Sequence, residues 1–230
     1  MPIPVVDIFA GPGGLGEGFS AFNEGDQNKF RSALSIEKEE RAHETLKLRS
    51  FLRQFRHQGL DFPSEYYDSL RNTPFDSTAL YEKFPCENQS AVEEAQCIEL
   101  GGKGPNNSSE NVDRLIDNAV GEAPFWGLLG GPPCQAYSNM GKARMGRERA
   151  SKDPRTELYR HYLRILAIHR PNFFIFENVR GISSSTKKGK NIFKKICRDL
   201  RNPCRAFRRM DFEQTPNYDL YAFASHDGQI

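Results

Sequence analysis

The chain has 230 residues, enough for one domain with a substantial hydrophobic core and too few for two comfortable ones. No apolar run approaches the ~20 residues of a membrane-spanning helix, and no secretory signal is found, so we expect a cytoplasmic protein with no membrane partner. The net charge of +2 divides into +15 over residues 140–209, from 20 Lys and Arg against 5 Asp and Glu, and −13 over the rest. Cations clustered in this way favour a polyanion such as nucleic acid as partner.

The first predicted element is a short strand over residues 3–9, which is followed by five glycines between Gly11 and Gly18. A glycine-rich turn between a strand and a helix lets a cofactor approach the backbone closely. Glu37, at the end of a second predicted strand over 33–36, is placed to accept hydrogen bonds from ribose hydroxyls. NAD and S-adenosylmethionine both carry adenosine, and both fit these two features.

A long charged helix is predicted over residues 39–57, and residues 58–110 form a polar insertion in which GGKGPNNSSE indicates an exposed loop. One further helical pattern begins at 19–22. Others are predicted over 64–71, 89–98, 112–120, 156–169 and 190–201. Further strands are predicted over 125–129, 173–176 and 220–224. This alternation predicts an α/β fold, with a mostly parallel, Rossmann-like sheet covered by helices on both faces, in one catalytic domain over 1–230.

A cysteine follows the predicted strand over 125–129, in the sequence Pro132-Pro133-Cys134-Gln135. The two prolines make the turn rigid and hold the thiol at the sheet edge, where a nucleophile could meet a ligand. The surrounding positive charge favours the thiolate; a buried structural cysteine is the alternative. The odd cysteine count predicts no disulfide framework, and no spacing predicts a metal site. We expect small buried thiols at Cys86, Cys97, Cys197 and Cys204.

Glu177 directly follows the apolar strand predicted over 173–176. Burial there would raise the pKa of this carboxyl and make it an acid or a hydrogen-bonding partner; a cap on the next turn is the alternative. A thiol and a carboxyl beside an adenosine-cofactor turn suit the methylation of cytosine. A thiolate added to C6 makes C5 nucleophilic, and a carboxyl at N3 stabilises the charge that develops there.

Three segments resemble signature motifs of the cytosine-C5 DNA methyltransferases in the family's order: DIFAGPGGLGEGF, GGPPCQAYS and FENVRG. A fourth, DPRTELYRHYLRIL at 153–166, resembles the segment between the nucleophile loop and the ENV strand, so the likeness covers about 1–40 and 112–182. The resemblance implies S-adenosylmethionine as methyl donor, S-adenosylhomocysteine as product, and a flipped-out cytosine of double-stranded DNA as substrate. It also implies prokaryotic restriction–modification, in which a cognate restriction endonuclease would be a partner.

The resemblance further implies roles for single residues. Cys134 would attack cytosine C6, and Glu177 would hold N3 and the exocyclic amine. The cofactor would be lined by Phe9, Gly11, Gly14, Glu37, Lys38, Asp113, Pro133 and Leu158. Asp113 would bind the adenine amine, although the sequence around it departs from the family pattern. The loop that closes over DNA would use Gln135, Ser138, Lys142 and Arg144.

Three parts of the family pattern are not found: a glutamine–arginine–arginine segment, the target-recognition domain and the last motif. We therefore expect the cofactor-binding and nucleophile-bearing part of a methyltransferase, with little sequence-specific activity on its own. Three alternatives stay open. A tRNA cytosine-C5 methyltransferase would use the same Cys134 and Glu177, a nicotinamide oxidoreductase would give these two residues no role, and a DNA-binding module would not be catalytic.

Overall fold

The structure, a computed structural model, divides into two compact units, Met1–Gly131 and Pro132–Ile230. It describes residues 1–24, 27–71, 75, 77–132, 158–177, 186–187, 190–207 and 210–221. Across those residues no helix combines the length and the apolar character that a membrane span requires.

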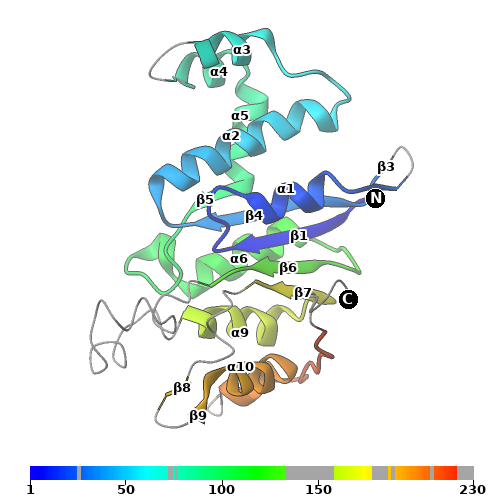
Figure 1. Cartoon of the computed structure of the whole chain (residues 1–230), viewed down its shortest axis with the longest axis vertical. Helices are drawn as coiled ribbons and strands as arrows, with labels where there is room; N and C mark the ends of the chain where they lie inside the picture. Colours follow the sequence, from blue (N-terminus) through cyan, green and yellow to red (C-terminus); the bar gives the residue numbers. More distant parts are fainter. Residues whose placement is uncertain are drawn as a thin grey trace. The chain divides into compact units, whose positions relative to one another are not determined.

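A parallel sheet forms the centre of the first unit (Figure 1). Its strands lie in the order β5 (Ala95–Cys97), β4 (Phe30–Glu37), β1 (Ile3–Ile8) and β6 (Gly127–Gly130). The register pairs the last residue of β1 with Ile36 and with the last residue of β6. The carboxyl ends of these strands therefore meet at one edge, which is where parallel sheets bind ligands.

Helices cover both faces of this sheet. Val5, Val6 and Ile8 are fully buried, although successive residues of a strand point to opposite faces. The covering helices are α1 (Gly14–Ser20) and α6 (Ser109–Val120) (Figure 1). Ser108 caps α6, because its hydroxyl accepts the Asn111 N–H at 3.1 Å. A short antiparallel hairpin, β2 (Asn23–Glu24) and β3 (Gln27–Asn28), connects α1 to β4.

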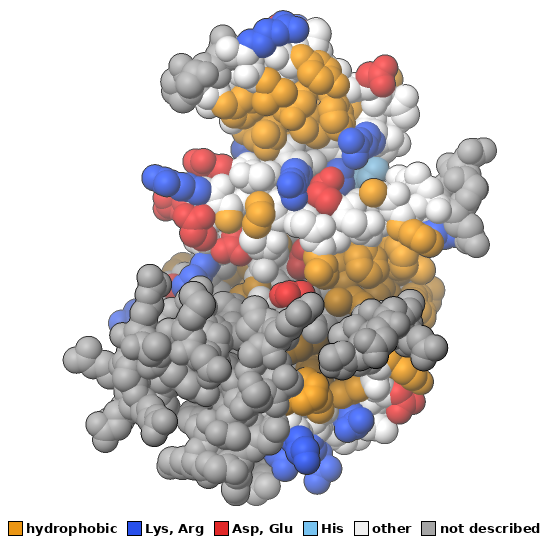
Figure 2. Space-filling view, in the orientation of Figure 1, with side chains coloured by type: hydrophobic (Ala, Val, Ile, Leu, Met, Phe, Trp, Pro, Cys, Tyr) orange, Lys and Arg blue, Asp and Glu red, His pale blue; other side chains and the backbone are white. Residues whose placement is uncertain are grey.

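The insertion over 58–110 is built against a long helix, α2 (Glu40–His57), whose first turn is capped by the side chain of Glu39. It contains α3 (Ser64–Arg71), α4 (Thr78–Lys83), α5 (Pro85–Glu94), strand β5 and the 3-10 turn η1 (Pro105–Asn107). Together α2, α4 and α5 form a core of their own, made of Phe51, Leu52, Phe55, Leu80 and Ala91. Apolar side chains also reach the surface at this end of the unit (Figure 2), among them Leu60, Tyr67 and Leu70.

The second unit contains α9 (Leu158–His169), β7 (Phe173–Phe176), the hairpin β8 (Thr186–Lys187) and β9 (Lys190–Asn191), α10 (Ile192–Arg201) and η4 (Pro203–Ala206). Tyr162 joins α9 to β7, because its ring packs on Phe176 and its hydroxyl donates to the Ile175 carbonyl at 2.8 Å. Tyr218 packs on Phe174 and donates to the Pro171 carbonyl at 2.9 Å. This unit therefore has its own packed aromatic core.

The α/β fold is confirmed, and most predicted elements lie within a few residues of their observed bounds. The helix expected from 19–22 begins at Gly14 instead. The helix predicted over 89–98 is wrong at its end, because α5 stops at Glu94 and the next three residues form β5. No strand includes residues 220 and 221, and residues 222–224 lie outside the described part of the chain.

The expectation of buried cysteines is confirmed for Cys204 alone of the four. Cys86 and Cys97 are exposed, Cys197 is half-buried and Cys204 is buried. Cys86 lies in the first turn of α5, and Cys97 ends β5, an outer strand of the sheet. Both positions face solvent, so the place in the fold decides the exposure of these thiols and not their ordinary preference for burial.

Candidate functional site

The glycine turn leaves the sheet at the end of β1 and is held there by backbone hydrogen bonds. The Ala10 N–H donates to the Ile36 carbonyl of β4 at 3.0 Å, and the Gly13 N–H donates to the Ala10 carbonyl at 3.0 Å. The chain therefore turns tightly over the carboxyl edge before α1 begins.

Three residues of the turn have left-handed backbone conformations: Phe9 with φ 58°, Gly11 with φ 56° and Gly13 with φ 91°. Glycine adopts this region freely, whereas Phe9 does so at a cost of about 1–3 kcal/mol. A Cβ built at Gly11 or Gly14 would meet no described atom within 4 Å. The turn thus presents bare backbone to open space, as the close approach of a ligand requires.

Glu37, the last residue of β4, ties the turn to the neighbouring strand. One carboxylate oxygen, Oε2, accepts the Gly11 N–H at 2.8 Å. The other, Oε1, accepts the N–H groups of Lys38 and Glu39 at 2.9 and 2.8 Å. A carboxylate offers about four acceptor positions, so Oε2 keeps one for a hydroxyl of a ligand.

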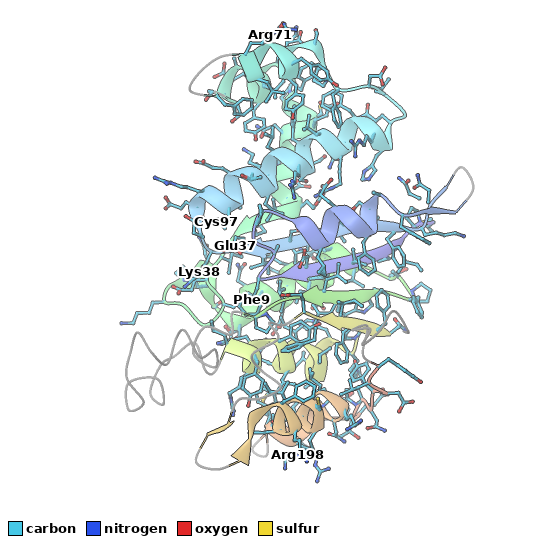
Figure 3. All side chains as sticks on the ribbon, in the orientation of Figure 1. Phe9, Glu37, Lys38, Arg71, Cys97 and Arg198 are labelled. Carbon is cyan, nitrogen blue, oxygen red and sulfur yellow. The ribbon has the colours of Figure 1, made fainter. Side chains whose placement is uncertain are left out.

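Side chains from three strand ends gather at this edge: Phe9 after β1, Glu37 and Lys38 at and after β4, and Cys97 at the end of β5 (Figure 3). Cys97 is the register partner of Glu37, and the Ile98 N–H donates to the Glu37 carbonyl at 3.0 Å. Partial desolvation by the neighbouring residues raises the pKa of the exposed Cys97 thiol, and so do the nearby glutamates, with Glu40 first. The thiol is therefore a neutral neighbour of the Glu37 carboxylate.

Lys38 and Asp113 were predicted to line the same site. The Lys38 ammonium pairs with Glu99 at 2.9 Å, and both side chains are more than half exposed, so the pair holds them weakly. Asp113 follows Val112 within helix α6 and is half-buried. Its proposed contact with the adenine amine stays a prediction.

Asp7 is a buried carboxyl directly below the turn, and sequence reasoning did not single it out. It is 1% exposed and accepts a backbone hydrogen bond from Gly16 of α1. Burial raises its pKa to about 7, against the opposing effects of the Gly16 bond and of Arg53. The sequence signal was available, because Asp7 interrupts an apolar strand.

The remaining predicted residues belong to the second unit. Leu158 begins α9 and is half-buried. Glu177 follows β7 and is exposed, so the expected burial of this carboxyl is wrong. All four residues of β7 are only half-buried, and the strand therefore does not enclose the residue at its end. Outside the described residues lie Pro133, Cys134, Gln135, Ser138, Lys142 and Arg144.

A parallel sheet with a glycine turn after one strand and a carboxylate at the end of the next defines the class: an α/β fold that can receive an adenosine cofactor at this edge. Residues 105–203 match the family model described as C-5 cytosine-specific DNA methylase. Over this segment the chain is similar to the cytosine-C5 DNA methyltransferases.

Known type II methyltransferases are similar to the chain over most of its length. M.Bpa9945I of Bacillus paralicheniformis is 34% identical over 198 residues, which are 81% of this chain and 42% of that protein. M1.HphI of Haemophilus parahaemolyticus is 44% identical over 179 residues, 78% of this chain and 33% of that protein. The chain thus spans less than half the length of these relatives. Among solved structures, the Entamoeba histolytica methyltransferase EhMeth aligns with a TM-score of 0.44 and 18% identity, over 87% of this chain and 43% of that one.

Proposed function

We propose that the chain binds S-adenosylmethionine at the glycine turn and belongs to an enzyme that methylates C5 of cytosine in double-stranded DNA. The observation that carries the proposal is the bond from the Gly11 N–H to Glu37, which joins the open backbone of the turn to a carboxylate. The likeness of residues 105–203 to the family of C-5 cytosine-specific DNA methylases supports the reaction. The type II names of the relatives support a role in restriction–modification, with a cognate restriction endonuclease as partner.

The residues present at the edge suit the two ends of this cofactor. The free acceptor position of Glu37 suits a ribose hydroxyl, and the half-buried ring of Phe9 offers an apolar contact. The bare backbone at Gly11 and Gly14 leaves room for the amino-acid portion. The cofactor supplies a methyl group activated by a sulfonium. The proposal extends the site to Lys38, Asp113, Pro133 and Leu158.

The proposed chemistry uses Cys134 and Glu177. The Cys134 thiolate adds to cytosine C6, which makes C5 nucleophilic toward the methyl carbon. Glu177 holds N3 and the exocyclic amine while charge develops on the ring; its exposure makes it accessible to a base. Loss of the C5 proton to water and departure of the thiolate then restore the ring. Contacts to the flipped-out nucleotide and its strand are assigned to Gln135, Ser138, Lys142 and Arg144.

Calorimetric titration tests the cofactor. We expect S-adenosylmethionine to bind and NAD not to bind. Glu37→Gln is expected to weaken binding about tenfold, because an amide accepts at one atom only, whereas the carboxylate must serve three N–H groups and a hydroxyl. Glu39→Gln is the matched control, since Glu39 caps α2 from an exposed position. Binding of NAD alone, or of neither ligand, contradicts the proposal.

A covalent trap tests the nucleophile and separates the alternatives. With S-adenosylmethionine and duplex DNA that carries 5-fluorocytosine, we expect an adduct that disappears in Cys134→Ser, because fluorine at C5 blocks release of the enzyme. An adduct with fluorinated transfer RNA but not with DNA would favour the tRNA methyltransferase. Retention of DNA without an adduct would favour the non-catalytic binding module.

A further inference from the structure

A buried arginine connects the helix after the glycine turn to the insertion. Arg53 of α2 is 4% exposed and forms ion pairs with Glu17 of α1 and Glu94 of α5. Glu94 is also buried, at 7% exposed, and Glu17 is 29% exposed. A buried cation between two carboxylates holds its partners firmly, because loss of either one leaves a charge uncompensated in a low dielectric.

Helix α1 depends on such contacts for its position. It has seven residues and no side-chain cap at its N-terminus, so it is too short to be stable by itself. Gly16 packs on β1, where an added Cβ would lie 3.5 Å from Asp7. Phe19 packs edge-to-face on Phe30 of β4, with ring centroids 4.9 Å apart. The Glu17–Arg53 pair joins α1 to α2, and the same arginine continues the link to Glu94 of the insertion.

Helix α2 also supports the turn itself. A Cβ at Gly13 would lie 2.7 Å from the Leu46 methyl, so the backbone of the turn rests directly on α2. The same helix therefore touches Gly13 through Leu46 and Glu17 through Arg53. Between these two points lies the start of α1, which includes Gly14 of the proposed cofactor site.

We propose that Arg53 is a positioning residue for the cofactor: through Glu17 it fixes the glycine turn, and through Glu94 it ties that turn to α5 of the insertion. This inference rests on the proposed function, because it names what holds the turn to which the cofactor would bind. The amino-acid portion of the ligand contacts the turn and depends on Arg53. The adenosine portion contacts Glu37, which belongs to β4 and is also held by the N–H groups of Lys38 and Glu39.

Two matched variants and two ligands test the proposal in the full chain. Glu17→Gln removes the carboxylate that pairs Arg53 with α1. Glu94→Gln removes the carboxylate that pairs the same arginine with the insertion. The ligands are S-adenosylhomocysteine and 5′-methylthioadenosine, which lacks the amino-acid portion. We expect Glu17→Gln to weaken the binding of S-adenosylhomocysteine about tenfold and that of methylthioadenosine only slightly. Glu94→Gln should have a smaller effect on the binding of both ligands. Equal weakening of both ligands, or of neither, by Glu17→Gln would overturn the proposal.

Amide hydrogen exchange at residues 10–16 gives a readout that needs no ligand. We expect faster exchange there in Glu17→Gln than in Glu94→Gln when both are matched for global stability. The triple variant Glu17→Gln/Arg53→Met/Glu94→Gln removes all three charges of the cluster and so avoids a buried unpaired charge. It is expected to fold and to behave at the turn like Glu17→Gln. Failure of wild type to bind S-adenosylhomocysteine would reject the proposed function, whereas unchanged exchange would reject the role of Arg53.

Discussion

Burial raises the pKa of the Asp7 carboxyl, which lies near the proposed site. The free energy of unfolding therefore depends on pH through this group. The folded-state pKa is about 7, against 3.8 for the ordinary carboxyl. The folded protein therefore prefers the neutral form. The stability that this group contributes is fully present below pH 3.8, declines as the pH rises and is lost above about pH 7.

We predict that Asp7→Asn makes the free energy of unfolding less dependent on pH. The amide is neutral at every pH and its oxygen still accepts the Gly16 N–H, so the variant should gain on wild type as the pH rises from about 4 to about 7. The full gain has an upper limit of about 4 kcal/mol. Urea denaturation of both proteins at several pH values measures it. A constant difference between them would show that Asp7 does not titrate in this range.

Single residues were predictable where sequence position and backbone chemistry coincide. Glu37 ends a strand next to a glycine turn, and a carboxylate there has N–H groups within reach. Glu177 was misjudged, because its exposure depends on what covers β7 and the apolar run cannot report that. Arg53 was not found either, because its two acidic partners come from distant parts of the chain.

At the scale of elements, the packing of α2 against the turn leaves no room for a side chain at Gly13. We predict that Gly13→Ala lowers the free energy of unfolding by about 1–3 kcal/mol, because alanine is strained at φ 91° and its Cβ would clash with Leu46. Denaturant titration measures the loss.

Gly14→Ala is the control for this variant. Its Cβ would meet no described atom within 4 Å, and alanine favours the helix that begins there. Its stability should stay unchanged or rise slightly, while its affinity for S-adenosylmethionine falls. Equal losses of stability at both positions would show that Leu46 does not support the turn.

Long elements were predictable and short ones were not. Helix α2 has 18 residues of charged and apolar sequence, and its predicted bounds of 39–57 differ from the observed ones by one residue. Helix α4 has six residues and β5 has three, too few to show a period. Strand β5 exists because β4 offers it a partner, and that pairing appears only once the chain has folded.

Across the whole molecule the charge is divided, with +15 over residues 140–209 and −13 elsewhere. We predict that changing Lys142, Arg144 and Arg147 to Glu weakens duplex DNA binding and flattens its salt dependence, because fewer counterions are released. Fluorescence anisotropy between about 50 and 200 mM salt measures both quantities.

The matched control reverses three cations outside this block, Arg71, Lys83 and Lys103, and so changes the net charge equally. It should leave the salt dependence almost unchanged. If both triple variants lose the same affinity, overall charge and not the 140–209 block attracts DNA.

Phe9 has a consequence for attempts to make this protein more robust. Its left-handed backbone stores strain that glycine would relieve, so a selection for heat resistance alone should accept Phe9→Gly. The same change removes the aromatic wall of the proposed cofactor site. Directed evolution would then meet a trade-off at this one codon, between higher thermal stability and cofactor binding.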